Sequence, residues 1–569
     1  MPGAGNDERM DASAPRGLLL AARVATVATL LLAAFAAIAL SPRVFYADPW
    51  RFAALQAQRP EWTTALASDN GHREILPNFV RLLELAWCDG APWLQGGIGL
   101  ALFAAAALVA WGATAGLPTA MRAAAGLALA AGVCWGGNFR EIAHGSELVH
   151  FAPVLLALAG GLRAVGAASP PTPRTGWLLA ACAVLATFGF SSGLACVPTF
   201  AVALWLRRAT WRCYAPLALG AALAVAGLVI DRDRPLASGQ AGALAMADQW
   251  LRWLGAPGTW AFSPLVDPAH AARLPWPPLA AAAGAIAEPL HAAFGPPLAA
   301  RWPALLFGAL GLAAALRATW RDRGADPGVV ARLGLGLAWM GLTVGAIVVA
   351  ARADYFVERP IQLTTQRYLP WSMLLWTGLT VRAVATARSG RRALLGAFGF
   401  WSVLAPSNVW TTRYAWKQCV VADRTAAAAV TGVLAADFEL EETVLTDLLA
   451  AIPPLRATGK GPFAWPEARW LAGAAGDRAP GDAAAPLRWL DDGALGELTV
   501  RVIANRLGEP GREVRFRGPT AHDRLLLAED GAPAGLAVRA PFHDEWFGWL
   551  QGAGTAPVGR IRAAALRRE

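Results

Sequence analysis

The sequence predicts a mainly α-helical, polytopic membrane protein, in which a bundle of about eleven transmembrane helices precedes a small α+β or all-β domain. Composition gives the first indication, because 56% of the 569 residues are hydrophobic and only 16% are charged. An ordinary soluble protein carries about 25% charged residues. The second indication is a series of apolar runs of roughly 15 to 24 residues, which suit the thickness of a bilayer.

The predicted membrane region covers residues 17–406. Its helices are expected at residues 17–40, 93–116, 119–137, 149–166, 176–190, 193–206, 213–230, 302–318, 329–350, 369–386 and 392–406. The first run exceeds a signal-peptide core of about 7–15 residues, so we expect an uncleaved anchor after a cytoplasmic tail at 1–16. A Gly-Phe-Ser-Ser-Gly stretch at 189–193 predicts a turn that splits 176–206 into two short helices.

The distribution of arginine predicts the orientation of these helices. Short loops on one side are rich in arginine and poor in acids, as at 207–212 and 388–392. The positive-inside rule assigns these loops and the N-terminus to the cytoplasm, which leaves the C-terminus outside. We therefore expect a membrane protein whose C-terminal domain is extracytoplasmic, in the periplasm or its equivalent.

The loops predicted on the outer side are long and carry both charge signs. They are residues 41–92, 138–148, 231–301 and 351–368. Loops held by a rigid bundle are a common place for a functional site. We therefore expect function on the outer face.

Residues 407–569 follow the membrane region. Residues 407–471 predict a helical segment, in which Pro453 and Pro454 end a helix that begins near Leu440. Residues 472–569 contain a linker at 473–485 and a small antiparallel β domain of about five strands. Alternating apolar residues mark these strands at 498–502, 514–516, 525–527, 536–538 and 561–563.

The richest polar cluster lies in the first outer loop, at residues 69–74. Asp69 and Glu74 are candidate catalytic carboxylates that would accept a proton from a hydroxyl. His72 titrates near neutral pH and Arg73 can hold a phosphate, so both are candidate substrate-binding residues. The alternative is structural, with Asp69 capping an amphipathic helix that carries these charges in its solvated first turn.

Asp48 is a third candidate catalytic carboxylate, because it follows the first membrane helix within a few residues. At the outer membrane surface it would draw a proton from an acceptor hydroxyl. The alternative is an N-terminal cap before Pro49, at the start of an interfacial helix.

Further candidate substrate-binding residues lie in two other outer loops. Arg140 and His144 belong to the loop 138–148, and Arg367 and Tyr368 stand just before a late helix. Arg367 would bind a lipid phosphate. The alternatives are a surface salt bridge between Arg140 and Glu141 and an Arg367 that snorkels beside an interfacial tyrosine.

Several functional classes are not indicated. The sequence contains no Gly-rich phosphate loop, HExxH or paired CxxC pattern. The net charge of +10 comes largely from loop arginines, so nucleic acid is not an expected partner. No spacing requires a metal or another cofactor, and a divalent cation is an alternative only if two outer carboxylates meet.

The order of these features resembles the GT-C superfamily of multi-pass membrane glycosyltransferases, and within it a broad bacterial group. The matching features are Asp48, His72-Arg73 with Leu76-Pro77 and Arg81-Leu82, Ser191 to Leu194, Arg367-Tyr368, and the segment from Pro453 to Trp465. One departure is Gly71, which stands where that group has an acid before the His-Arg pair. Asp69 or Glu74 would then substitute for it.

The resemblance implies an outward-facing site that moves a sugar from a polyprenyl-phosphate-linked donor to a glycan, lipid or protein acceptor. Carboxylates such as Asp48 would be catalytic, and His72, Arg73 and Arg367 would hold phosphate. The alternatives are a lipid-linked glycan transporter or flippase and a non-catalytic envelope scaffold. Transporters usually carry ionisable groups deep in the membrane, whereas Arg23 is the only charge well inside a predicted helix.

Overall fold

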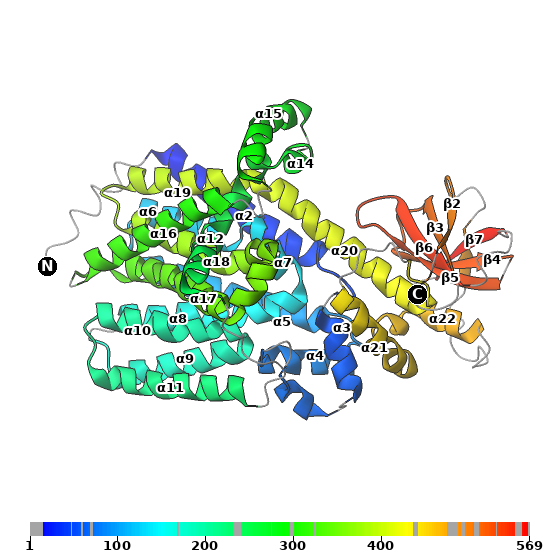
Figure 1. Ribbon diagram of the computed structural model, residues 1–569, viewed down its shortest axis with the longest axis horizontal. Coiled ribbons are helices and arrows are strands. Elements are labelled where there is room, and N and C mark those ends of the chain that lie inside the picture. The colour runs from blue at the N-terminus through cyan, green and yellow to red at the C-terminus, as the bar shows by residue number, and fades with distance from the viewer. Residues whose placement is uncertain are drawn as a thin grey trace. The chain divides into compact units, whose positions relative to one another are not determined.

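A computed structural model gives the fold of the chain (Figure 1). It describes residues 15–566 apart from 47, 59–60, 69–71, 168–169, 231–240, 275, 296–300, 324, 436–441, 475–486, 491–494, 504, 506–510, 531 and 552–559. The chain divides into two compact units. Unit 1 comprises 1–39, 66–77 and 96–415, and unit 2 comprises 40–65, 78–95 and 416–569.

Unit 1 is mainly helical. Its helices are α2 (Arg16–Ala39), α5 (Trp93–Ala113), α6 (Thr119–Val133), α7 (Phe139–Ala143), α8 (Gly145–Ala167), α9 (Pro173–Gly189), α10 (Cys196–Leu206), α11 (Trp211–Val229), α12 (Ala243–Ala261), α13 (Ser263–Val266), α14 (Pro268–Ala271), α15 (Pro277–Phe294), α16 (Arg301–Asp322), α17 (Val329–Glu358), α18 (Leu369–Ala385) and α19 (Gly390–Leu404). Short 3-10 turns join them at η2 (Thr114–Gly116), η3 (Gly136–Asn138), η4 (Ser191–Ala195), η5 (Pro360–Thr364), η6 (Gln366–Tyr368) and η7 (Ala405–Ser407).

Seven helical segments in the described part of the chain are long and apolar enough to cross a membrane. They are Arg16–Ala39, Trp93–Gly116, Thr119–Ala143, Gly145–Ala167, Trp211–Val229, Arg301–Asp322 and Val329–Glu358. This confirms a mainly helical fold with apolar segments of membrane-spanning length, whereas the predicted count of about eleven spans is not confirmed. The other four predicted spans correspond to α9, α10, α18 and α19, which have only 11 to 17 residues.

The predicted break within 176–206 is present. Helix α9 ends at Gly189, Phe190 adopts an extended backbone conformation, and α10 begins at Cys196 after the turn η4. The break places the Phe190 side chain in the unit-1 interior, where its ring stacks against Trp371.

Helix α17 is central to unit 1 and packs against α8, α10, α12 and α18 (Figure 1). Its contact with α18 is close because both helices carry glycine at the crossing. A Cβ atom on Gly334 would lie 2.6 Å from the Gly378 carbonyl oxygen, and one on Gly378 would lie 2.3 Å from the Gly334 oxygen. Small residues allow such helix pairs to pack backbone against backbone. This contact fixes the positions of the side chains on α17 and α18.

Residues 231–301 differ from the long loop that the sequence predicts. The described part of this segment contains α12, α13, α14 and α15, and α12 packs against α16 and α17. Helix α12 was not predicted from the sequence because it contains Gly255, Pro257 and Gly258, which are typical of loops and turns. Within the fold, Gly255 allows a close approach to the backbone of Ala304 on α16.

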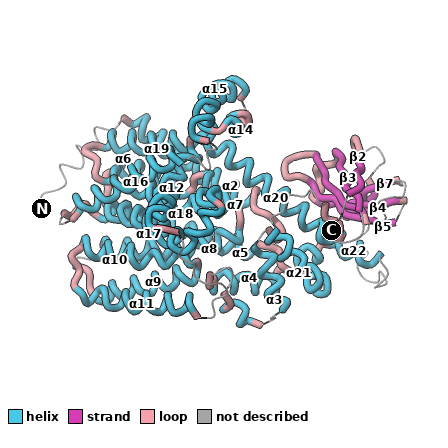
Figure 2. Tube along the Cα trace, viewed as in Figure 1, coloured by secondary structure: helices cyan, strands magenta, loops and turns pink. Residues whose placement is uncertain are grey.

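Unit 2 combines helices with a sheet, and Figure 2 shows the strands in magenta. Its elements are α3 (Asp48–Gln58), η1 (Trp62–Leu66), α4 (Ile75–Trp87), α20 (Asn408–Thr431), α21 (Glu442–Thr458), η8 (Gly461–Ala464), α22 (Pro466–Ala474), β1 (Leu487–Trp489), β2 (Thr499–Ile503), β3 (Gly511–Arg517), β4 (Arg524–Glu529), β5 (Ala532–Arg539), β6 (Glu545–Leu550) and β7 (Ile561–Leu566). Elements η1, α4, α5 and α20 cross the division between the units.

The strands form one antiparallel sheet in the order β1-β7-β4-β5-β6-β3-β2. Apolar residues cover both faces, because Leu526 belongs to the core shared with the helices while Leu525 and Leu527 belong to the opposite face. The five predicted strands correspond to β2, β3, β4, β5 and β7. Strand β6 was missed because it is buried almost continuously and shows no alternation.

Helix α21 continues beyond the predicted stop at Pro453 and Pro454 and ends at Thr458. Buried Leu445, Leu448 and Leu455 lie on both sides of the prolines. Packing of this apolar face maintains the helix despite the backbone donors that proline removes.

Candidate functional site

The candidate site in unit 1 is centred on a buried pair, Glu74 and His150. Glu74 precedes α4 directly, and His150 lies in the second turn of α8. His150 Nε2 and Glu74 Oε2 are 2.9 Å apart, and the two side chains are only 6% and 7% exposed. A carboxylate and an imidazole at this distance can share and transfer a proton.

Glu147 and Arg140 extend the pair on the other side of the imidazole ring. His150 Nδ1 lies 3.5 Å from Glu147 Oε2, so carboxylates face both ring nitrogens. Arg140 donates to Glu147 Oε1 through Nε at 3.2 Å and Nη2 at 2.9 Å. The i,i+3 spacing on α8 puts Glu147 and His150 on one face of the helix. Arg140 thus has a partner different from the surface pair with Glu141 that the sequence suggested.

Glu141 adds another acid to this part of the site. It is 4% exposed and lies within electrostatic range of Arg140, Glu147 and His150. Its Oε2 has no hydrogen-bond partner among the residues that the structure describes. A buried carboxyl oxygen without a partner is costly, and such groups occur preferentially at functional sites.

Phe190 separates two histidines. Its ring stacks on His72 at a centroid distance of 4.9 Å and on His150 at 5.4 Å. Trp371 lies parallel to the other rings at 6.0 Å from Phe190. This aromatic stack orients both imidazoles. It depends on the interruption between α9 and α10, which directs the Phe190 side chain into the interior of unit 1.

Arg352 connects the histidines to Tyr368. Its Nη2 lies 3.4 Å from His72 Nε2, and its Nη1 donates to the Tyr368 hydroxyl at 3.2 Å. Arg352 also has a non-helical backbone conformation, φ −136° and ψ 19°, within α17. Such departures inside helices occur at kinks and are frequent at functional sites. The kink lies next to the predicted end of this helix at residue 350.

The other predicted substrate-binding residues have different surroundings. Arg367 donates to Gln362 Oε1 at 2.8 Å and lies 5.1 Å from the centroid of the Tyr368 ring. The turn η6, which carries both residues, packs against α7. Arg73 donates instead to the carbonyl of Ile230, at the C-terminal end of α11. His144 is 2% exposed and ends α7.

Two predicted catalytic carboxylates are not part of the described cluster. Asp48 begins α3 in unit 2, and its side chain is not among those that the structure describes. Asp69 lies outside the described residues. Glu74 is therefore the one of the three predicted carboxylates that the structure places beside other ionisable groups.

Unit 2 contains a second buried carboxyl, Glu84 on α4. Gln95 donates to it through its backbone N at 3.1 Å and through its side-chain amide. Arg81 donates to Gln95 at 3.3 Å and to Asn78 at 2.8 Å. Burial raises the pKa of Glu84 to about 7. Every neighbour here is an amide or a guanidinium, so the cluster has no second group that titrates near neutral pH.

Arg352 and Phe190 are among the contributing residues that were not proposed from the sequence. Arg352 follows a long apolar run, and an arginine at the end of a membrane helix resembles an ordinary anchor. Phe190 lies in the predicted break, which predicts a turn but not the direction of a side chain. Arg352 lies two residues beyond the predicted end of this helix at 350, so a search for ionisable residues inside predicted membrane helices does not find it.

The cluster can support proton transfer beside an anionic group. Glu74 and His150 provide the proton acceptor, while Arg352 and Arg367 provide cations. Among the described residues there is no group of three or more His, Cys, Asp or Glu side chains arranged to hold a metal ion. In comparisons with known proteins, no family model, no curated protein and no solved structure matches this chain.

Proposed function

We propose that the protein is a membrane glycosyltransferase of the GT-C type, which transfers a sugar from a polyprenyl-phosphate donor to a hydroxyl of an envelope acceptor. The observation that carries the proposal is the buried Glu74–His150 pair, which is joined through the Phe190 ring to His72 and its neighbour Arg352. This combination of a base and cations suits a reaction in which a hydroxyl loses a proton and a phosphate leaves.

The acceptor oxygen attacks the anomeric carbon of the donor sugar. The bond between this carbon and the phosphate oxygen breaks, and the phosphate leaves with the electron pair. The acceptor proton passes to the Glu74 carboxylate, which becomes a neutral acid, and His150 can take up that proton in turn across the contact of 2.9 Å. This assignment replaces Asp48 with Glu74 as the base.

Arg352 and Arg367 would hold the donor phosphate. Arg352 is connected to His72 and Tyr368, and Arg367 lies over the Tyr368 ring, so both guanidinium groups start from fixed positions. A guanidinium suits this role because it donates in a planar fork that matches phosphate oxygens. His72 contributes orientation through Arg352 and Phe190.

We place the reaction on the outer face of a bacterial inner membrane, with a cytoplasmic N-terminus and an extracytoplasmic C-terminal domain. Basic residues support this orientation. Arg317, Arg321 and Arg392 gather around one cavity near the C-terminal end of α18, and Arg352, Arg367 and Tyr368 lie near its N-terminal end. The positive-inside rule then assigns the acidic cluster to the outer side.

Analysis of cell-envelope glycans tests the proposal. Cells that lack the protein should lose one glycan modification, and wild-type protein should restore it. A Glu74→Gln protein inserted at the same level should not restore it. Envelope glycans that are identical with and without the protein would contradict the proposal.

A lipid-linked glycan flippase is the second candidate. The observation that favours it is the position of Glu147, His150 and Arg352 on helices that are long and apolar enough to span a membrane. Ionisable residues in such helices often mark transport pathways. Reconstituted protein distinguishes the two, because a flippase moves the intact donor between leaflets whereas a transferase releases polyprenyl phosphate.

A further inference from the structure

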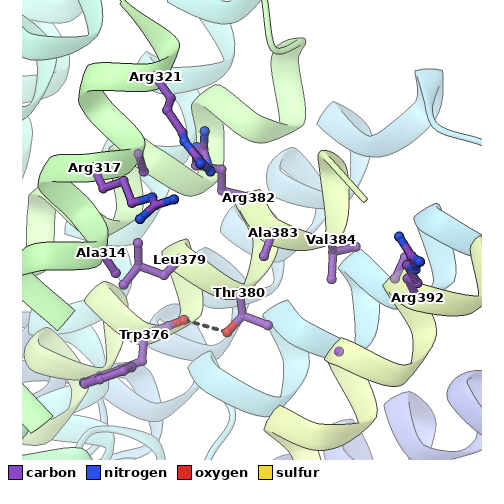
Figure 3. A pocket seen from close by; sticks show the side chains of 13 residues that line it. Ala314, Arg317, Arg321, Trp376, Leu379, Thr380, Arg382, Ala383, Val384 and Arg392 are labelled. Atoms are coloured by element: carbon purple, nitrogen blue, oxygen red, sulfur yellow. Dashed lines mark hydrogen bonds between the residues drawn. The ribbon is translucent and has the colours of Figure 1, made fainter. Parts of the chain in front are cut away.

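A cavity of about 510 Å³ lies between α16, α18 and α19 in unit 1 (Figure 3). Four arginines line it, Arg317, Arg321, Arg382 and Arg392, together with mostly apolar side chains. In Figure 3, Arg317, Arg321 and Arg382 occupy one part of the lining and Arg392 another. The volume falls within the range of roughly 300–1,000 Å³ that is usual for small-ligand sites.

The charge of this cavity is only partly balanced. Arg382 forms a bidentate pair with Asp322, with contacts of 2.5 and 2.8 Å. Within the described part of the chain, no carboxylate is recorded within ion-pair distance of Arg317, Arg321 or Arg392, and all three are exposed. Arg317 and Arg321 occupy the same part of the lining, and two guanidinium groups placed in this way favour an anion that accepts several hydrogen bonds, such as a phosphate.

The rest of the lining is suited to a hydrocarbon chain. Trp376, Leu379, Ala383 and Gly396 contribute apolar surface to the lining. On α16, Trp320 is 72% exposed and Arg323 lies 5.6 Å from the centroid of its ring. Exposed tryptophan beside arginine is typical of the level of the lipid head groups. The cavity therefore combines a cationic end with an apolar wall at this level.

The cavity is separate from the acid and histidine cluster. Tyr368 caps the N-terminal end of α18, and Arg382 lies near its C-terminal end. At 1.5 Å per residue these positions are roughly 20 Å apart along the helix axis. A phosphate in the cavity is thus remote from Glu74 and His150.

We propose that this cavity binds an anionic phospholipid, with the phosphate on Arg317 and Arg321 and one acyl chain along Trp376, Leu379 and Gly396. Basic pockets between membrane helices are a recognised way to hold acidic lipid head groups. The proposal does not depend on the glycosyltransferase reaction.

Lipid binding to the purified full-length protein in phosphatidylcholine nanodiscs tests the charge requirement, with phosphatidylglycerol as the probe. Arg321→Gln should weaken binding about tenfold, as expected for the loss of a charge-assisted hydrogen bond. Arg391→Gln is the control, because it makes the same change of net charge at an exposed residue that does not line the cavity. Equal binding by the two variants, or equal binding of phosphatidylcholine and phosphatidylglycerol, would overturn the proposal.

A second pair of variants tests the acyl-chain part without altering charge. A Cβ atom on Gly396 or on Gly399 would meet no other atom within 4 Å, so both positions tolerate a side chain. Only Gly396 lines the cavity. Gly396→Leu should therefore weaken phosphatidylglycerol binding and Gly399→Leu should not. Unchanged binding by Gly396→Leu would contradict the assigned chain position.

Competition with soluble anions identifies the source of the phosphate. Inorganic phosphate and glycerol 3-phosphate have no acyl chain, so neither should displace phosphatidylglycerol at equal concentration. Displacement by either anion would show that the cavity is a site for free phosphate and would overturn the lipid assignment.

Discussion

Two buried carboxyls, Glu74 and Glu84, stand ten positions apart in the chain and have different partners. Glu74 faces His150 at 2.9 Å, in a cluster that also contains Glu147, whereas Glu84 receives hydrogen bonds from Gln95. Both residues are nearly inaccessible, at 5% and 1% exposure. Burial alone therefore does not distinguish a reactive carboxyl from a structural one.

The difference lies in the capacity of the partner to titrate. An imidazole accepts and releases a proton near neutral pH, so a carboxyl beside it can pass a proton onward. An amide cannot do so, and the hydrogen bonds of Gln95 serve only to satisfy a buried acid. The comparison predicts a catalytic role for Glu74 and a structural role for Glu84.

The largest expected effect is on turnover. Glu74→Gln keeps the shape of the side chain and removes the proton acceptor, so sugar transfer should fall by about a hundredfold to ten-thousandfold, the usual value of a general base. Glu84→Gln makes the same chemical change in the other cluster and should leave turnover within about a factor of three. A comparable loss in both variants would remove the distinction between the two carboxyls.

Arg352, near the Glu74 cluster, and Arg81, in the Glu84 cluster, provide the second comparison. Arg352→Gln should raise the KM for the donor about ten- to a hundredfold, because it removes a charged donor to the phosphate. Arg81→Gln should lower thermal stability because it removes the hydrogen bonds to Asn78 and Gln95, and it should leave KM unchanged because both partners belong to the Glu84 cluster of unit 2. Arg352→Lys should recover part of the affinity. An unchanged KM in Arg352→Gln would exclude Arg352 from phosphate binding.

The pH dependence of the free energy of unfolding tests the structural role of Glu84. Burial raises the pKa of Glu84 from its ordinary value of 4.5 to about 7. The folded state then binds more protons than the unfolded state between these values, so the contribution of Glu84 is fully present below pH 4.5 and is lost as pH rises through 7. The loss should amount to about 1 to 3 kcal/mol.

Thermal unfolding of detergent-solubilised protein at pH 5 and pH 7.5 measures this loss. Glu84→Gln should show a weaker decline over this interval than the wild type. Asp423 titrates in the same window, because burial raises its pKa to about 7 as well, so the difference between wild type and Glu84→Gln isolates Glu84. Identical declines in the two proteins would contradict the proposed burial.

The smallest expected effect concerns Tyr368. Tyr368→Phe removes the hydroxyl that accepts a hydrogen bond from Arg352 at 3.2 Å, which should cost about 1 kcal/mol of stability. Tyr355→Phe is the control, because Arg359 contacts the ring of Tyr355 rather than its hydroxyl. Equal unfolding temperatures in the two variants would show that the Arg352 contact contributes nothing.

The sequence predicts which segments contribute to the site better than it predicts which of their side chains are in contact. Polar residues between apolar helices are conspicuous, which is why Glu74, His72 and Arg140 were candidates. The pairing of Glu74 with His150 joins residues far apart in the chain, and no spacing rule reports such a contact. Arg352 was missed because its role depends on a kink that the apolar pattern does not reveal.

For the fold, too, some features could be predicted from the sequence and others could not. Helical character and the C-terminal sheet follow from apolar runs and alternation, and both are confirmed. Helix α12 and strand β6 were missed because Gly255 and Pro257 suggested a loop and because a fully buried strand lacks alternation. In each case tertiary packing outweighs the local signal.

The products formed by the purified protein in liposomes test the central claim most directly. Wild-type protein supplied with a labelled polyprenyl-phosphate sugar and an acceptor should release one polyprenyl phosphate for each sugar transferred, and Glu74→Gln should release almost none. Transfer at an equal rate by Glu74→Gln, or movement of the intact donor between leaflets without release of polyprenyl phosphate, would contradict the proposed role of the Glu74–His150 pair.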